Sequence, residues 1–208
     1  MLNNTIILNK NYSNIVNQLY IMTEEIIIGI SGASGVQYGI RILETLKQME
    51  GYKTHLVISG SAKKLIRIET EFSVQEVEQL GDHVYDDDDF TASIASGSHK
   101  TKGMIIAPCS AKTLASIAVG MSDTLISRAA DVCLKEKRPL VLMVRETPLN
   151  LIHIKNMERA AKAGASILPA CPAFYPKPKS IDEIINFMAG RALDLLHIEH
   201  NLYKRWRE

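Results

Sequence analysis

Small and hydroxyl-bearing residues follow the first apolar run of the chain, in an arrangement that suits an anion. Residues 26–30 are mostly Ile and lead into Gly32, Ala33 and Ser34, after which a helical pattern begins. Glycine lets a ligand approach the backbone, and the free N–H groups at the start of a helix favour negative charge. The segment therefore predicts a loop that binds a phosphate-bearing ligand, and a glycine turn without a ligand is the alternative.

The spacing of the glycines argues against two common nucleotides. Gly29, Gly32 and Gly35 are spaced G-x-x-G-x-x-G rather than G-x-G-x-x-G, and the second expected strand ends at Ser59 without the acidic residue that holds an NAD ribose. No Lys follows the loop, so the sequence lacks the Walker A pattern of ATP-binding loops. A mononucleotide such as FMN remains.

Polar or small residues also follow the other expected strands. Ser59 ends the second strand, residues 108–113 follow the third, and Arg145 and Glu146 end the fourth. Ligands of open parallel sheets bind beyond the carboxyl ends of the strands, so these groups together can surround a phosphate and a polar heterocycle. Each Ser or Thr alone is also an ordinary helix N-cap.

Strand-like and helix-like segments alternate along the chain. Strands are expected at 25–31, 53–59, 103–107, 139–145 and 165–169, and helices at 35–50, 60–68, 110–119, 122–137, 150–163 and 181–197. This alternation predicts an α/β fold: a single-domain parallel sheet of the flavodoxin or Rossmann type with helices on both faces. Residues 70–100 are the least regular. The four Asp at 86–89 are interpreted as a solvated loop, with a metal site involving His83 as a less favoured alternative.

Composition limits the class of protein. The chain has 208 residues, 46% of them hydrophobic, which suits one domain with a sizeable core, and its net charge of +1 gives no reason to expect a nucleic-acid surface. Cys109, Cys133 and Cys171 form no C-x-x-C pair, so we expect reduced thiols in a cytoplasmic protein. No apolar run approaches the roughly 20 residues that span a membrane. Residues 1–21 are expected to be a poorly ordered extension before a domain at 22–208.

Charged residues on two expected helices are further candidates. Arg128, Asp131 and Lys135 share one helix face, which is either a solvated row of ion pairs or a basic surface for an anion. Arg191 projects from an otherwise apolar helix. Trp206 is the only Trp, and a lone Trp near a terminus usually packs against the core.

Seven separated segments recur, in the same order, in a known protein family. The shared segments are 29–39, 95–98, 107–110, 127–132, 138–142, 145–148 and 172–175. From about residue 25 to its end, the chain resembles the UbiX/Pad family of flavin prenyltransferases. The resemblance implies the fold of the flavin-containing Cys decarboxylases.

An activity is implied by the same resemblance. The family makes prenylated FMN, the cofactor of UbiD-type decarboxylases, by joining a dimethylallyl group to N5 of reduced FMN and closing a fourth ring at C6. The usual donor is dimethylallyl monophosphate, and no metal is needed. Members were formerly described as aromatic-acid decarboxylases, and they assemble into dodecamers with sites at subunit junctions.

Site residues are also implied by the matching motifs. FMN would be held by Gly32, Ala33, Ser34, Ser59, Ser110, Ala111, Lys112, Thr113 and Arg145. The prenyl phosphate would meet Ser96, Gly97, Arg128, Lys135, Glu146, Tyr175 and Arg191. The catalytic set would be Glu69 as the acid/base group, Trp206 lining the prenyl pocket, Ser34 and Glu146. Several cations suit a phosphate dianion, and neutralising a leaving phosphate is electrostatic catalysis.

Two other functions stay open. One is a flavin-dependent cysteinyl decarboxylase of the same fold; such enzymes usually carry a catalytic His after the first loop and an Asn in the third-strand loop. Here Lys112 stands in that loop, and His55, His83 and His99 match no such motif. The other is a non-catalytic FMN-binding partner of a decarboxylase. A second set of phosphate-binding cations argues against a simple flavin binder.

Overall fold

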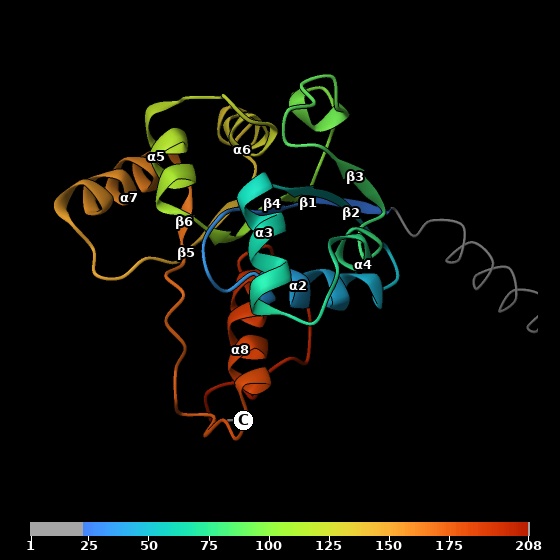
Figure 1. Ribbon diagram of the computed structural model, residues 1–208, viewed down its shortest axis with the longest axis vertical. Helices are drawn as coiled ribbons and strands as arrows, with labels where there is room; N and C mark the ends of the chain where they lie inside the picture. Colours follow the sequence, from blue (N-terminus) through green and yellow to red (C-terminus); the bar gives the residue numbers. More distant parts are fainter. Residues whose placement is uncertain (1–22, 208) are drawn as a thin grey trace, which may run out of the picture.

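Six parallel strands form the sheet, in the order β3-β2-β1-β4-β5-β6 (Figure 1). The computed structural model describes residues 23–207. The strands are β1 (Glu24–Ile30), β2 (Tyr52–Ile58), β3 (His83–Tyr85), β4 (Gly103–Cys109), β5 (Leu140–Val144) and β6 (Ser166–Ile167). This is the Rossmann strand order, in which the direction of winding reverses between β1 and β4. Ligands of such sheets bind beyond the carboxyl ends at that point.

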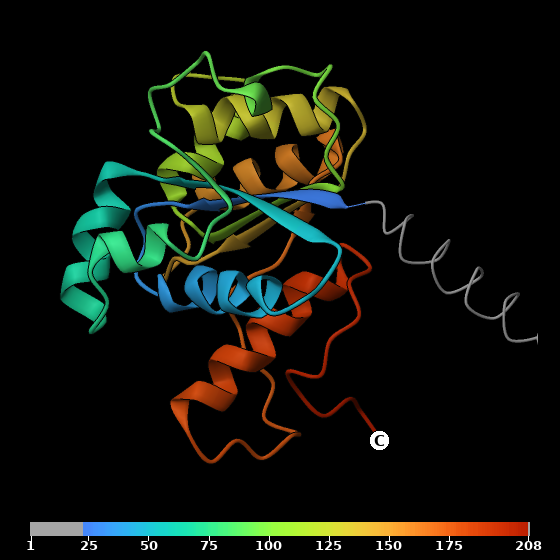
Figure 2. The same cartoon turned by 90° about the vertical axis from the view of Figure 1, so that its right-hand side faces the viewer.

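Helices cover both faces of the sheet, as the edge-on view in Figure 2 shows. On one face lie α2 (Gln37–Lys47) and α8 (Ile181–Asp194). The other face carries α5 (Ala111–Val119), α6 (Leu125–Lys135) and α7 (Leu151–Ala163). The segment between β2 and β4 adds α3 (Gly60–Glu69), α4 (Val74–Glu78) and the 3-10 turn η1 (Ser93–Ala95). The two layers of helices leave the carboxyl ends of the strands free for a site.

The Ile run of β1 occupies the centre of two cores. Ile26, Ile28 and Ile30 pack under α2 and α8, and Ile27 packs under α6. All four are at most 1% exposed. A strand that is apolar on both faces is typical of a parallel sheet covered by helices, which confirms the predicted fold class.

The expected elements are present, with bounds that differ by at most three residues. Sequence reasoning missed β3, α4 and η1, which all lie in the irregular segment 70–100. β3 is a three-residue edge strand that is mostly exposed, so it has no apolar alternation to recognise. α4 spans five residues behind a capping box of Ser73 and Glu76, too few for a periodic pattern.

The interpretation of residues 86–89 as a solvated loop is wrong for Asp87. Its Oδ1 accepts a hydrogen bond from the N–H of Ile126 (3.0 Å), and its backbone oxygen accepts one from Leu125 (2.7 Å). Asp87 thereby satisfies two N–H groups in the first turn of α6. Burial raises the pKa of Asp87. Within residues 23–207, the Asp run does not converge with His83 on a set of three metal ligands.

Three further expectations concern the chain as a whole. Cys109 and Cys133 are buried and Cys171 is exposed, and all three are free thiols, as the cysteine spacing predicted. Between residues 23 and 207, no helix has the length and apolar character needed to cross a membrane. The extension predicted at 1–21 lies outside the described residues.

Candidate functional site

A buried hydroxyl joins the carboxyl ends of β1 and β4. The Oγ of Ser31 donates to the carbonyl oxygen of Pro108 (2.9 Å) and accepts from the N–H of Ser110 (2.8 Å). The N–H of Ser31 also donates to Pro108 (3.2 Å), and the residue is 1% exposed. The two loops predicted to bind phosphate are therefore fixed next to each other.

A cavity of about 530 Å³ opens beside these strand ends. Its walls come from the loop after β1, the starts of α3, α5 and α6, and the end of β5. Eight of the nine residues predicted to hold FMN line it: Gly32, Ala33, Ser59, Ser110, Ala111, Lys112, Thr113 and Arg145. Ser34 is exposed and is not part of the wall. The volume falls within the roughly 300–1,000 Å³ of small-molecule sites.

Besides α6, two helices with serine N-caps begin at the cavity wall. Ser59 caps α3 by accepting from the N–H of Ala62 (3.2 Å), and Ser110 caps α5 by accepting from Thr113 (3.2 Å). Each cap satisfies one of the first N–H groups of its helix and leaves others for a ligand. Two converging helix N-termini place partial positive charge at the same cavity, which favours an anion.

Arg145 brings a full positive charge with an unsatisfied donor. Its Nε is buried and has no hydrogen-bond partner among the described residues. Leaving a buried donor unpaired costs about 1–3 kcal/mol, which a ligand oxygen at this position would recover. Arg145 therefore fits the phosphate of a mononucleotide.

Gly32 approaches α3 too closely for a side chain. A Cβ at this position would lie 2.5 Å from the Cβ of Ser61, at the start of that helix. The loop therefore presents bare backbone beside the helix N-terminus. Together with the unpaired Arg145 donor, this geometry fits FMN as the bound group.

Cys109 lies at the end of β4 but supplies no nucleophile. Burial raises the pKa of its thiol to about 12, so the reactive thiolate is absent at neutral pH. Glu146 lines the cavity next to Arg145, and its Oε1 accepts a hydrogen bond from the N–H of Thr147 (3.0 Å). Glu146 is therefore one of three acidic residues at this wall, together with Asp87 and Asp123.

Glu69 holds the glycine loop from outside the cavity wall. Its Oε2 accepts a hydrogen bond from the N–H of Gly35 (2.8 Å), and the side chain of Gln37 donates to its carbonyl oxygen (2.9 Å). Glu69 ends α3 and is half-buried. The structure thus places the predicted acid/base residue against the loop that carries Gly32 and Ser34.

Four predicted donor-binding residues gather beside α6. Arg128 donates from Nε to the carbonyl oxygen of Ala95 (3.1 Å), which precedes Ser96. A Cβ on Gly97 would lie 2.7 Å from the Nζ of Lys135. The backbone of 95–97 therefore runs directly along two cations of α6.

Tyr175, Arg191 and Trp206 form a second group near the end of α8. The rings of Tyr175 and Trp206 meet edge to face, with centroids 5.0 Å apart. Arg191 contacts Asp194 (3.0 Å) and the hydroxyl of Tyr203 (3.5 Å). Trp206 is 64% exposed and packs on Tyr175 rather than in either buried core.

The two groups lie on opposite faces of the sheet. α6 packs on the β1 face that carries Ile27, and α8 packs on the other (Figure 2). Glu146 lies with neither group, since it lines the cavity at the strand ends. A single chain therefore does not bring the predicted donor-binding residues together.

Each cation predicted to bind the donor already has a carboxylate neighbour. The pairs are Arg128 with Asp131 (3.0 Å), Lys135 with Glu136 (2.5 Å) and Arg191 with Asp194 (3.0 Å). The predicted row of ion pairs thus ends at Asp131, because Lys135 turns to Glu136 instead. Burial alone would raise the pKa of Asp194, but hydrogen bonds from Arg205 and Tyr203 hold it below its ordinary value.

Sequence reasoning missed several polar residues of the cavity wall, including Lys64, Asp87, Asp123 and Thr124. Lys64 adds a cation, and Thr124 lies at the start of α6, where its hydroxyl caps the helix. A signal for Lys64 was present, because positions 61 and 64 share one face of the helix that follows Ser59. Thr124 gives no such signal, since its place depends on how α6 packs.

Comparison with known proteins adds independent evidence. The Flavoprotein family model matches residues 18–193. Flavin prenyltransferase UbiX of Salmonella typhimurium is 49% identical over 186 residues, which are 88% of this chain and 98% of that protein. The chain belongs to the UbiX family of flavin prenyltransferases.

Two solved structures related to UbiX share the fold. AnUbiX (PadA1), in complex with FMN and dimethylallyl pyrophosphate, has a TM-score of 0.87 and 44% identity, covering 89% of this chain and 98% of that one. A dodecameric FMN-dependent UbiX-like decarboxylase of Escherichia coli O157:H7 has a TM-score of 0.87 and 43% identity, covering 88% of this chain and 100% of that one. Both confirm the predicted fold.

We expect Arg145→Ala to weaken FMN binding about 10- to 150-fold, because removing a charged hydrogen bond costs about 1.5–3 kcal/mol. Quenching of flavin fluorescence during titration measures the dissociation constant. Arg159→Ala, on the exposed side of α7, is the matched control and should leave it unchanged. An affinity of Arg145→Ala within twofold of wild type would show that Arg145 does not contact the flavin.

Proposed function

We propose that this chain transfers a dimethylallyl group from dimethylallyl monophosphate to N5 and C6 of reduced FMN, forming prenylated FMN for a UbiD-type decarboxylase. The proposal rests on the cavity at the carboxyl ends of β1 and β4. In this cavity the buried Nε of Arg145 has no hydrogen-bond partner among the described residues. Membership of the UbiX family supports this function over a cysteinyl decarboxylase or a non-catalytic partner.

The loop after β1, the starts of α3 and α5, and Arg145 bind and orient FMN. Their partial and full positive charges balance its phosphate, and the bare backbone at Gly32 admits it closely. Reduced FMN, when bound, supplies the nucleophilic N5. AnUbiX in complex with FMN and dimethylallyl pyrophosphate supports FMN and a phosphorylated dimethylallyl donor as ligands of this chain.

Departure of the donor phosphate depends on cations and aromatic rings. Arg128, Lys135 and Arg191 neutralise charge that builds up on the leaving phosphate. The faces of Trp206 and Tyr175 stabilise positive charge on the allylic carbons and exclude water. Glu69 is the acid/base group that takes up the proton released when N5 is prenylated, using Oε1, because Oε2 is bound to the N–H of Gly35.

A second chain is needed to complete this donor site. Assembly that brings the end of α8 from one subunit to the α6 of another would unite the two groups of residues. The dodecameric E. coli relative supports a dodecamer here.

Exposed apolar side chains give such an assembly a surface. Leu151, Ile152 and Ile154 at the start of α7 are 64%, 68% and 49% exposed. Most apolar side chains of α8 are buried within the chain, as Phe187 and Leu193 illustrate. We therefore place a subunit contact at the start of α7.

A direct test uses the whole chain with reduced FMN and dimethylallyl monophosphate under anaerobic conditions, followed by the mass of the extracted flavin. A gain of one five-carbon prenyl unit supports the proposal. Unmodified FMN, under conditions in which Salmonella typhimurium UbiX converts it, overturns it. Loss of carbon dioxide from a peptide ending in Cys would instead support a cysteinyl decarboxylase.

Glu69→Gln should slow prenyl transfer by about 10²- to 10⁴-fold, the usual range for one acid/base group. The amide oxygen of Gln still accepts from Gly35, so the loop and FMN binding should persist. Single-turnover flavin spectra measure the rate, and fluorescence titration checks the binding. An unchanged single-turnover rate would remove Glu69 from the mechanism.

Arg191→Ala should raise the KM for the donor about 10- to 150-fold and leave the FMN dissociation constant within a few-fold. Asp194 keeps His200 (3.1 Å) and Arg205 (2.8 Å) as partners, so the local fold should survive. Steady-state kinetics with varied donor measure KM, and Arg145→Ala serves as the reciprocal variant. If Arg191→Ala instead abolishes FMN binding or unfolds the protein, with donor affinity unaffected in any rescued sample, Arg191 is a structural residue.

A further inference from the structure

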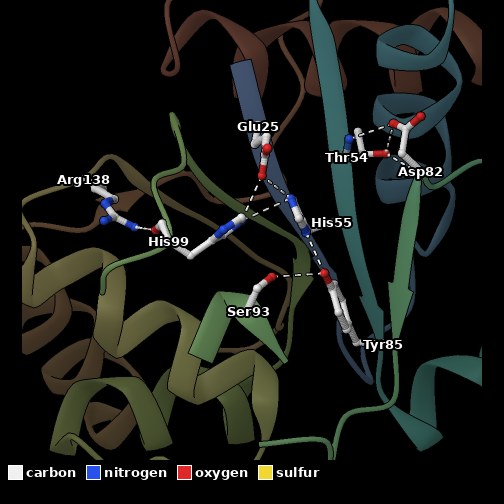
Figure 3. A network of polar contacts seen from close by, with 8 residues as sticks. All are labelled: Glu25, Thr54, His55, Asp82, Tyr85, Ser93, His99 and Arg138. Atoms are coloured by element: carbon white, nitrogen blue, oxygen red, sulfur yellow. Dashed lines mark hydrogen bonds and ion pairs between the residues drawn. The ribbon is translucent and has the colours of Figure 1, made fainter. Parts of the chain in front are cut away.

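A cluster of ligand-type side chains lies toward the amino ends of the strands, away from the FMN cavity (Figure 3). Glu25 comes from β1, His55 from β2, and His99 from the loop before β4. The Oε2 of Glu25 is 2.7 Å from Nε2 of His55 and 2.8 Å from Nε2 of His99. The two Nε2 atoms are 3.5 Å apart. Three atoms with metal-binding lone pairs thus converge on one point.

The sheet register positions two of these residues. Ile27 of β1 is paired with His55 of β2, and Glu25 lies two residues before Ile27. Because side chains alternate along a strand, Glu25 and His55 project from the same face. The third residue is held by Arg138, which donates to the carbonyl oxygens of His99 (2.7 Å) and Gly97 (2.6 Å). Strand register therefore positions Glu25 and His55, and the hydrogen bonds from Arg138 position the backbone of His99.

We propose that Glu25, His55 and His99 form a binding site for a divalent transition metal, with Zn²⁺ the best fit. Two imidazole nitrogens and one carboxylate oxygen are a characteristic zinc ligand set. Tetrahedral bonds of 2.0–2.1 Å place ligand atoms about 3.3 Å apart, close to the separation of the two Nε2 atoms. The Oε2 of Glu25 has to move away from the two Nε2 atoms by only roughly half an ångström to reach this separation. The Glu25 side chain is 32% exposed, so it has room to move.

Outer contacts already orient His55 for this role. Its Nδ1 lies 3.0 Å from the hydroxyl of Tyr85, which in turn lies 3.2 Å from the Oγ of Ser93. With a metal on Nε2, the Nδ1–H donates to Tyr85, and Tyr85 donates to Ser93. Such a second contact fixes the tautomer and ring orientation of a metal-binding histidine. His83 stacks on the His55 ring, with centroids 4.8 Å apart.

A metal here joins three separate parts of the chain. It fixes β1 and β2 to the loop that follows η1, and water completes its coordination, since the His99 side chain is 26% exposed. The site lies apart from the FMN cavity, and the proposal does not depend on the proposed function. The competing interpretation is a metal-free cluster in which Glu25 accepts hydrogen bonds from both histidines.

The test compares the full chain with His99→Gln and Glu25→Gln. Competition with a chromophoric chelator measures Zn²⁺ affinity and stoichiometry, and Co²⁺ absorption reports tetrahedral coordination. His153→Gln, on α7, is the matched control. Residues 1–22 contain no His, Cys, Asp or Glu, so they add no competing ligands of these types.

We expect wild type and His153→Gln to bind one Zn²⁺ per chain. The Zn²⁺ affinity of His99→Gln and of Glu25→Gln should be lower by about 10- to 100-fold or more. Tyr85→Phe should weaken binding within the same range, a loss that a simple hydrogen-bonded cluster does not predict. Zn²⁺ should raise the Tm of wild type but not of Glu25→Gln. Equal Zn²⁺ binding by wild type and Glu25→Gln, or no binding by folded wild type at micromolar metal, overturns the proposal.

Discussion

The buried hydroxyl of Ser31 fixes the two loops at the cavity relative to each other. It links the ends of β1 and β4, the two strands at which the winding of the sheet reverses. The glycine loop follows one of these ends and the start of α5 follows the other. Since the hydroxyl serves as donor and acceptor at once, neither loop can shift without leaving a buried polar group unpaired. The anion-binding geometry at the cavity depends on this one side chain.

Arg145 differs from Arg128 and Arg191 in the partners that its guanidinium already has. Arg145 is kept with a buried donor unpaired, so binding an anion relieves a cost that folding has already imposed. Arg128 and Arg191 are instead paired with neighbouring carboxylates, at partly exposed positions where such pairs contribute only about 0–1 kcal/mol. A phosphate can displace these weak pairs. The first arrangement favours tight binding of the flavin phosphate, and the second favours weaker binding of the donor phosphate.

Much of the fold and of the cavity at the strand ends could be predicted, because both follow from local pattern. The Ile run of β1 and the small residues after each strand fix the sheet and the edge where ligands bind. Asp87 and the cluster of Glu25, His55 and His99 could not be predicted in this way. Their neighbours are set by strand register and loop packing, and the three cluster residues are 30 and 44 positions apart along the chain. Nothing in their immediate sequence marks them as a group.

If the proposed donor site is shared between chains, the placement of Arg128 and Arg191 on opposite faces of the sheet has a genetic consequence. When a site is shared between chains, two differently damaged copies of the gene can compensate for each other. Some junctions in a mixed assembly would receive an intact α6 from one chain and an intact α8 from another. Cells that carry one allele with a defective Arg128 and one with a defective Arg191 would then retain activity that neither allele provides alone.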